Sequence, residues 1–231
     1  MTTINFGRSD YLTDYVERFA LTPESMALVI VDMQYATGSR NHGLGKRLHD
    51  EGQGESVRWR YEQIEERVVP NLRVLLNTFR SRELPVFHIT IGSATGDFSD
   101  MLPQIRPIAQ GLDNRVGHKH HEIVEELRPL PGEPVFNKTT IGAFASTGLD
   151  SALRVRGVRQ LLIGGISTNA CVAATAMAAV DLGYETSILS DGCSAAREDY
   201  HLATLESFAR LFGRVVTTGQ ILESFEGGAE T

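Results

Sequence analysis

The segment LLIGGISTNACVAATAMAAV, residues 161–180, decides the fold of this chain. It contains no charged residue and is about as long as a helix that crosses a bilayer. However, a Gly-Gly pair and a Ser-Thr-Asn run lie near its middle, at residues 164–169, and predict a turn there. We therefore interpret the segment as a buried strand, a turn and a helix, and we expect no association with a membrane.

Other short apolar runs on both sides of this segment follow the same strand pattern. They are rich in β-branched residues, as buried parallel strands are. The predicted strands are residues 26–32, 85–91, 134–136, 160–164 and 186–190, with a sixth candidate at 214–217. Helical patterns lie between them at residues 61–82, 120–127, 149–155, 169–182 and 200–212.

Strands that alternate with helices along the whole length predict an α/β fold. We expect a three-layer α/β/α sandwich around a mainly parallel, doubly wound sheet of about six strands. Because no repeat or linker divides the 231 residues, we expect a single domain over residues 1–231. Residues 1–25 are predicted to form an N-terminal arm, on which Tyr11, Tyr15 and Phe19 form a helical stripe. Residues 36–56, polar and rich in glycine, predict a long active-site loop.

Composition and charge exclude several classes of protein. The hydrophobic fraction of 42% and the charged fraction of 22% are ordinary for a globular chain, and two cysteines do not make a disulfide scaffold. The formal net charge is −7 and no basic stripe is present, so we expect no nucleic-acid partner. The first residues lack the apolar core of a secretory signal, and we therefore expect a cytoplasmic protein.

Three polar side chains follow predicted strands, at the edge of the sheet where parallel sheets bind ligands. Asp32 ends the first strand, Lys138 follows the third, and Cys171 lies in the first turn of the helix after the fourth. A helix N-terminus stabilises a thiolate, so we expect a lowered pKa for Cys171. The three residues together can supply a nucleophile, a base and an electrostatic partner. Each alone has an ordinary alternative, as a core cysteine, a strand-end acid or a surface lysine.

The sequence resembles the isochorismatase-like cysteine hydrolases over residues 24–225. The resemblance is carried by ALVIVDMQ (27–34), FNKTTIGAF (136–144), LLIGGISTNACV (161–172) and LSDGCSA (189–195). It implies an isochorismatase-like fold, with Asp32 as general base and acid, Lys138 as its charged partner and Cys171 as nucleophile. It also implies a cis peptide bond between Ile166 and Ser167, and an oxyanion hole formed by the N–H groups of Ser167 and Cys171.

The implied reaction is hydrolysis of a C–N bond in a small amide or ureide through a thioester, with release of ammonia or an amine. Biuret-, triuret-, carbamoyl- and ureidoacrylate-like substrates belong to this class, and neither a metal nor an organic cofactor is expected. The Asp-x-His of metal-dependent nicotinamidases is missing from residues 88–97. Hydrolysis of another amide, such as maleamate or nicotinamide, is an alternative. A non-catalytic module that binds a small molecule is a second one.

Four further residues are predicted to contact the substrate. Gln34 and Tyr35 follow Asp32, and Phe144 is predicted to form an apolar wall. Arg197 lies in a loop where members of the carbamoylsarcosine type have a carboxylate-binding arginine. Each of the four has a structural alternative in loop orientation or core packing. The N-terminal arm and the resemblance predict a homodimer or a homotetramer.

Overall fold

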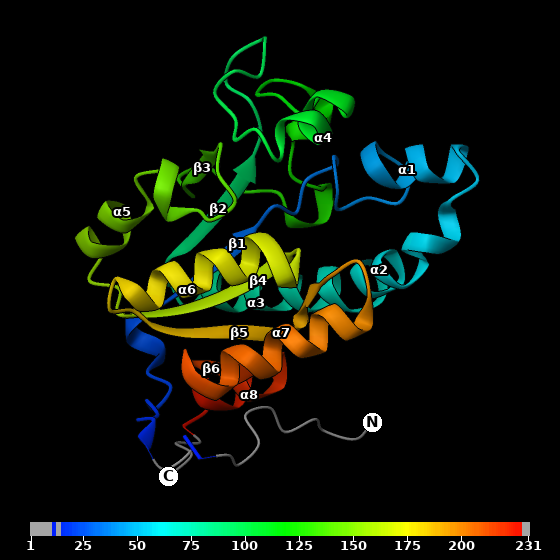
Figure 1. Ribbon diagram of the computed structural model, residues 1–231. Coiled ribbons are helices and arrows are strands. Elements are labelled where there is room, and N and C mark those ends of the chain that lie inside the picture. The colour runs from blue at the N-terminus through cyan, green and yellow to red at the C-terminus, as the bar shows by residue number, and fades with distance from the viewer. Residues whose placement is uncertain (1–10, 13–14, 228–231) are drawn as a thin grey trace.

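The computed structural model describes residues 11–12 and 15–227 and contains a six-stranded sheet (Figure 1). Its strands are β1 (Met26–Val31), β2 (Val86–Ile91), β3 (Val135–Lys138), β4 (Gln160–Ile166), β5 (Glu185–Ser194) and β6 (Arg214–Val216). The order is β3-β2-β1-β4-β5-β6, and every neighbouring pair is parallel. The predicted α/β fold with a doubly wound sheet is therefore confirmed.

The central strand β1 is buried on both faces, and this determines the three-layer architecture. One core contains Met26, Leu28 and Ile30, and the other contains Ala27, Val29 and Val31. Successive residues of a strand point to opposite faces, so one uninterrupted apolar run contributes to two cores.

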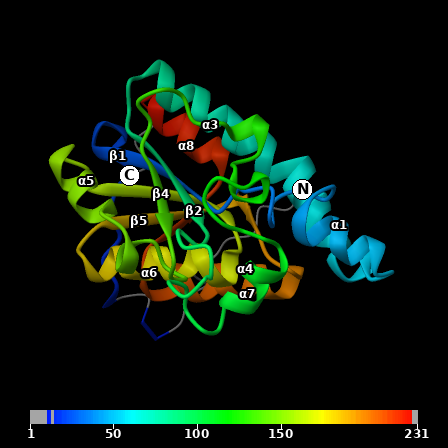
Figure 2. The same ribbon diagram turned by 90° about the horizontal axis from the view of Figure 1, so that it is seen from above.

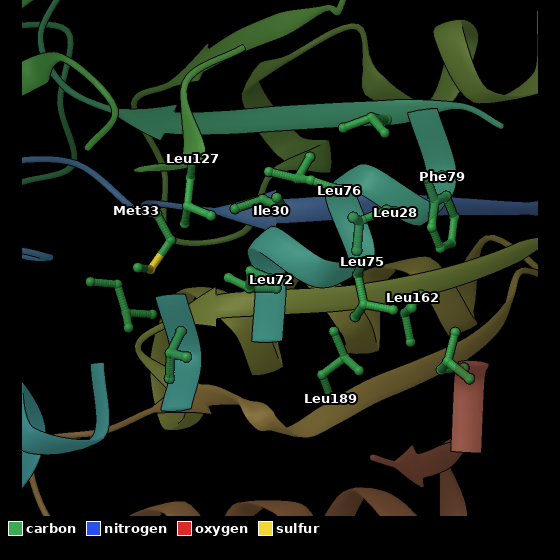
Figure 3. Close-up of a cluster of buried hydrophobic side chains, with 14 of the residues drawn as sticks. Leu28, Ile30, Met33, Leu72, Leu75, Leu76, Phe79, Leu127, Leu162 and Leu189 are labelled. Atoms are coloured by element: carbon green, nitrogen blue, oxygen red, sulfur yellow. The ribbon is translucent and has the colours of Figure 1, made fainter. Parts of the chain in front are cut away.

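One face of the sheet is covered by α3 (Val69–Ser81) and α8 (Thr218–Phe225) (Figure 2). The α3 side chains in the core recur at helical spacing and pack toward β1, β4 and β5 (Figure 3). They are Leu72, Leu75, Leu76 and Phe79. Helix α8 is absent from the helices predicted from sequence. It begins with a capping box between Thr217 and Gln220, a local signal that was available in the sequence.

The opposite face is covered by α5 (Leu149–Val155), α6 (Ala173–Asp181) and α7 (Glu198–Leu211) (Figure 2). These helices contribute Leu153, Ala176 and Phe208, among others, to the second core. Within the described ranges, none of the helices combines the length and the apolar character of a membrane span.

The predicted helix at residues 61–82 is longer than expected and changes its winding before Pro70. It runs from α2 (Arg58–Gln63) through a π-helical turn, η4 (Ile64–Val68), into α3. Pro70 is the second residue of α3, where its missing N–H and its ring are tolerated because the wider turn precedes it.

Two expectations about local structure were wrong. Residues 36–56 contain α1 (Gly43–Asp50) instead of forming only a loop. A Cβ on Gly43 would lie 2.2 Å from the Ala36 carbonyl oxygen, so this glycine permits close packing of the helix against the chain that follows β1.

Residues 120–127 form two short 3-10 turns, Lys119–His121 and Glu125–Leu127, in place of the predicted helix. Their backbone pairs with the chain that follows β1. Tyr35 N–H donates to the Glu122 carbonyl, and Val124 N–H donates to the Met33 carbonyl. These long-range bonds use backbone groups that an α-helix would pair internally.

The described part of the N-terminal arm packs against its own chain. Arg18 Nη1 donates to the carbonyl oxygens of Ala209 and Gly213, and both Tyr11 and Tyr15 are exposed. The predicted stripe crosses residues 13–14, which lie outside the described residues. Residues 17–22 have no regular secondary structure, so the stripe does not continue as a helix to Phe19.

Candidate active site

Asp32, Lys138 and Cys171 lie together at the carboxyl ends of the strands. The Lys138 ammonium nitrogen is 2.8 Å from Asp32 Oδ2 and 3.4 Å from Cys171 Sγ. Asp32 follows β1, Lys138 ends β3, and Cys171 lies in η8 (Thr168–Val172), a π-helical turn between β4 and α6. The chain reverses its direction of winding between β1 and β4, which is where doubly wound sheets bind ligands.

The backbone has unusual conformations just after β1 and within β4, where the two strands lie side by side. Asp32 has a φ of +54°, in the left-handed region that few residues other than glycine adopt. Gly165 in β4 has a φ of +116°, and a Cβ there would lie 2.1 Å from the Val31 carbonyl oxygen. The glycine therefore lets β4 pass close to the end of β1, directly beside Asp32.

The Asp32–Lys138 ion pair is almost completely withdrawn from water. Lys138 is 0% exposed and Asp32 is 3% exposed. Burial raises the pKa of Asp32, and the opposing effects of Lys138 and Cys171 do not offset it. Burial by itself lowers the pKa of Lys138, but its interactions with Asp32 and Cys171 outweigh burial and raise the pKa. Asp32 Oδ1 has no hydrogen-bond partner among the described residues, so one basic oxygen is left to accept a proton.

The pKa of Cys171 differs from the expectation. Burial raises the pKa of its thiol to about 12, and the negative charge of Asp32 adds to the increase. Lys138 acts in the opposite direction without offsetting them. The predicted lowering was wrong because desolvation and the neighbouring carboxylate exceed the effect of the helix N-terminus. The resting thiol therefore needs a base, and Asp32 lies beside it.

The turn that carries Cys171 begins with a cis peptide bond between Ile166 and Ser167, as the resemblance implied. The Ser167 carbonyl oxygen accepts hydrogen bonds from the N–H groups of Ala170 and Val172, at 3.0 and 3.2 Å. The predicted oxyanion hole, formed by the N–H groups of Ser167 and Cys171, stays a prediction. His201 Nδ1 lies 2.8 Å from Thr168 Oγ1 and helps to hold the start of the turn.

Gln34 is completely buried, and its side chain is engaged by the main chain. Its Nε2 donates to the carbonyl oxygens of Ile91 and His121, and its Oε1 accepts from Ile91 N–H. Both amide N–H groups are thereby used. Gln34 consequently connects the end of β1 to the end of β2, and the structure does not direct it at a substrate.

The described contacts of Tyr35 and Phe144 are with residues other than Asp32, Lys138 and Cys171. Tyr35 lines a separate cleft of about 410 Å³ with Arg40, His42 and other residues, and Lys119 Nζ lies 4.0 Å from its ring centroid. Phe144 stacks on Tyr184, with 6.0 Å between ring centroids, and packs against the second core. Core packing, the structural alternative for Phe144, describes its position.

Arg197 does not reach the candidate site. Its guanidinium forms an exposed ion pair with Asp199, in which the two side chains are 62% and 57% exposed, and lies over the Tyr200 ring. The expected carboxylate contact is therefore not supported. The loop at the start of α7 turns this side chain toward solvent, and its nearest anion is two residues away in the sequence.

Sequence reasoning missed Arg60 in α2. This arginine is 5% exposed, and its Nη1 donates to Ser167 Oγ at 2.8 Å. A signal existed, since Arg60 precedes Ile64 and Val68 at the helical spacing that defines the buried face. A charged residue at the start of that stripe is unexpected and requires an explanation.

No cluster of three or more His, Cys, Asp or Glu side chains suited to a metal ion occurs in the described part of the chain. The fold and site define an α/β protein with a buried carboxylate, a buried ammonium and a half-buried thiol at the switch point of its sheet. The isochorismatase domain model matches residues 26–220. The chain belongs to the isochorismatase family of hydrolases.

Three known proteins illustrate the similarity. The ureidoacrylate amidohydrolase RutB of Acinetobacter baylyi is 29% identical over 225 residues, which cover 91% of this chain and 87% of RutB. An isochorismatase family protein from Desulfovibrio vulgaris has a TM-score of 0.74 and 25% identity, over 87% of this chain and 98% of that one. N-carbamoylsarcosine amidase from Thermoplasma acidophilum has a TM-score of 0.65 and 26% identity, over 84% and 96%.

Proposed function

We propose that this chain is a cysteine-dependent amidohydrolase that cleaves a C–N bond of a small amide or ureide, without a metal or an organic cofactor. The observation that carries the proposal is the position of Lys138 Nζ, 2.8 Å from Asp32 Oδ2 and 3.4 Å from Cys171 Sγ. Similarity to a ureidoacrylate amidohydrolase and to an N-carbamoylsarcosine amidase supports this class of reaction.

In the first half-reaction, Cys171 Sγ attacks the carbonyl carbon while its proton moves to Asp32. The unpartnered Oδ1 is the oxygen suited to accept it, and the raised pKa of Asp32 makes it more basic than an ordinary aspartate. The N–H groups of Ser167 and Cys171 stabilise the oxyanion. The C–N bond then breaks, the leaving nitrogen takes the proton from Asp32, and a thioester remains on Cys171.

In the second half-reaction, a water molecule attacks the thioester and gives one proton to Asp32. The C–S bond breaks, and the proton returns to Cys171 Sγ. The net reaction consumes one water and yields an acid and ammonia or an amine. Lys138 keeps its positive charge throughout, because it faces a carboxylate in one state and a thiolate in the other.

The test is ammonia release from a panel of ureides, maleamate-like amides and nicotinamide. Cys171→Ala should lower kcat/KM by about 10⁴-fold or more, because the nucleophile has no substitute. Mass spectrometry of quenched wild-type reactions should find the acyl group on the peptide that contains Cys171. Activity should survive a chelator.

Cys193→Ala is the matched control. Cys193 lies in β5 and is buried, and burial raises its pKa, but its sulfur lies against the Ile163 carbonyl in β4, away from Asp32 and Lys138. This variant should keep its turnover. Undiminished turnover in Cys171→Ala would refute the proposed function.

A further inference from the structure

Arg60 is a buried cation whose side chain is bound by uncharged groups. It is 5% exposed, and among the described residues no carboxylate oxygen lies within 4.0 Å of its nitrogens. Burial lowers its pKa, and its interactions with Tyr61 and Cys171 oppose this decrease. A guanidinium keeps its charge near neutral pH, and a buried charge without a counter-ion is costly. The presence of Arg60 therefore requires a reason beyond the stability of the fold.

The contacts of Arg60 join three segments at the carboxyl ends of the strands. Its Nη1 donates to Ser167 Oγ at 2.8 Å, and its Nη2 donates to the Thr37 carbonyl at 3.2 Å. Its own main-chain carbonyl accepts from the hydroxyl of Ser194 at 3.2 Å. Thr37 follows β1, Ser167 follows β4 and Ser194 ends β5. Arg60 thus fixes the start of the nucleophile turn relative to the chain that follows Asp32.

Ser167, at the start of this turn, is held through two of its three polar groups. Its carbonyl accepts from the N–H groups of Ala170 and Val172, and its hydroxyl accepts from Arg60. The remaining polar group is its N–H, the predicted donor to the oxyanion. Such a donor stabilises the transition state only if it already points to the place where the charge develops. A planar guanidinium bound at two acceptors limits the rotation of the Ser167 side chain.

The charge of Arg60 also suits the proposed reaction. In the resting site the negative charge lies on Asp32, where Lys138 faces it. During the attack this charge moves to the carbonyl oxygen of the substrate, on the side of Ser167. Cys171 acts on the pKa of Arg60, so the guanidinium lies within electrostatic reach of the nucleophile. A fixed cation on this side favours the transition state over the resting state.

We infer that Arg60 is a positioning residue, which holds Ser167 so that the N–H of Ser167 is directed at the oxyanion. This inference rests on the proposed function. Arg60 acts through Ser167 and does not itself contact the substrate. A merely structural clamp would contribute to stability in the same way, but its removal would leave the turnover of the folded enzyme unchanged. The two roles are therefore separated by kinetics.

The test measures kcat and KM of Arg60→Met, Ser167→Ala and the double variant, with the amide or ureide that the wild type hydrolyses fastest. Ser167→Ala removes the hydroxyl that accepts from Arg60 and keeps the main-chain N–H. Each single change should lower kcat by about tenfold or more and leave KM within about threefold, because a misdirected donor is missed mainly in the transition state. The double variant should lie within about threefold of the poorer single variant, because both changes break the same contact.

Arg58→Met is the matched control. It removes an arginine two residues away on the same helix, whose exposed side chain pairs with Glu55, and kcat should stay unchanged. Losses that multiply in the double variant, or an undiminished kcat in either folded single variant, would overturn the inference. If Arg60→Met does not fold, Ser167→Ala alone decides between these results. A wild type that hydrolyses none of the amides and ureides of the panel would instead remove the proposed function, and with it the inference.

Discussion

Asp32 and Glu133 are two carboxylates largely withdrawn from water, and they have opposite surroundings. Glu133, just before β3, accepts bonds from Arg80 Nε at 2.7 Å, Arg80 Nη2 at 2.8 Å and Leu130 N–H at 2.9 Å, and lies 3.1 Å from His88 Nε2. Asp32, just after β1, has Lys138 on one oxygen and no described partner on the other.

The pKa values follow these surroundings. Burial works against the ionised form of Glu133, but the hydrogen bonds from Arg80, Leu130 and His88 lower its pKa to about 2. For Asp32 burial prevails, and the pKa is raised. A fully bonded carboxylate holds its charge and stabilises the fold, whereas an under-bonded one remains able to take a proton. The difference separates a structural acid from a candidate catalytic one within the same sheet.

The sharpest test of this comparison is Asp32→Asn. We expect kcat/KM to fall by about 10³-fold or more, because Asp32 is the proposed acceptor of the thiol proton. At the same time Cys171 should react faster with iodoacetamide at neutral pH. Burial and Asp32 both raise the pKa of Cys171 and Lys138 lowers it, so removal of the carboxylate takes away one of the two raising influences and keeps the lowering one. Lys138→Met should have the reverse effect on the labelling rate. Slower labelling in a folded Asp32→Asn protein would contradict this account.

Glu133→Gln should lower the stability of the protein and leave its activity nearly unchanged. The change removes the counter-charge of Arg80 and the partner of the buried His88, which costs about 2 to 3 kcal/mol of unfolding free energy. Turnover should stay within about threefold of the wild type at a temperature where the protein is folded. Urea denaturation and ammonia release measure the two quantities. A large loss of turnover with unchanged stability would mean that Glu133 is not the structural member of the pair.

The dependence of stability on pH should reveal Glu133 directly. Its pKa is about 2 in the folded protein and 4.5 in the unfolded reference, so its contribution is present above pH 4.5 and lost as the pH falls toward 2. The full contribution is at most about 3 kcal/mol. Urea denaturation below pH 4.5 should show this slope in the wild type, and Glu133→Gln should flatten it.

His201 provides a second window of pH for the same measurement. Burial lowers its pKa to about 4 from 6.5, so the neutral form favours folding. The contribution of His201 to the free energy of unfolding is fully present above pH 6.5 and is lost as the pH falls toward 4. Glu133→Gln should leave this slope intact, which distinguishes the two groups.

The smallest effect is expected for the Arg197–Asp199 ion pair, which is exposed to solvent, unlike the carboxylates Asp32 and Glu133. Both side chains are more than half exposed, and such pairs contribute little. Arg197→Gln should change kcat/KM by less than about twofold and leave the urea midpoint of unfolding nearly unchanged. A large loss of activity would restore Arg197 as a substrate contact.

Local patterns predicted most of the architecture. All six strands of the sheet were recognised from short apolar runs. The runs of β1 and β4 are the clearest, because a strand buried on both faces has few polar interruptions. The helix at residues 120–127 and the loop at residues 36–56 were misassigned, because distant backbone partners and close glycine packing decided these segments. Helix α8 was overlooked although its capping box is local.

For the candidate site, the sequence by itself determined which residue types follow the strands, and parallel strands bring Asp32, Lys138 and Cys171 to one edge. Only the tertiary structure decided that Gln34 is used by the main chain, that Arg197 faces solvent, and that Arg60 lies beside Ser167. It also reversed the expected direction of the Cys171 pKa shift. The physical reason is that burial and hydrogen bonding depend on segments far apart in the chain, whereas strand and helix patterns depend on neighbours in sequence.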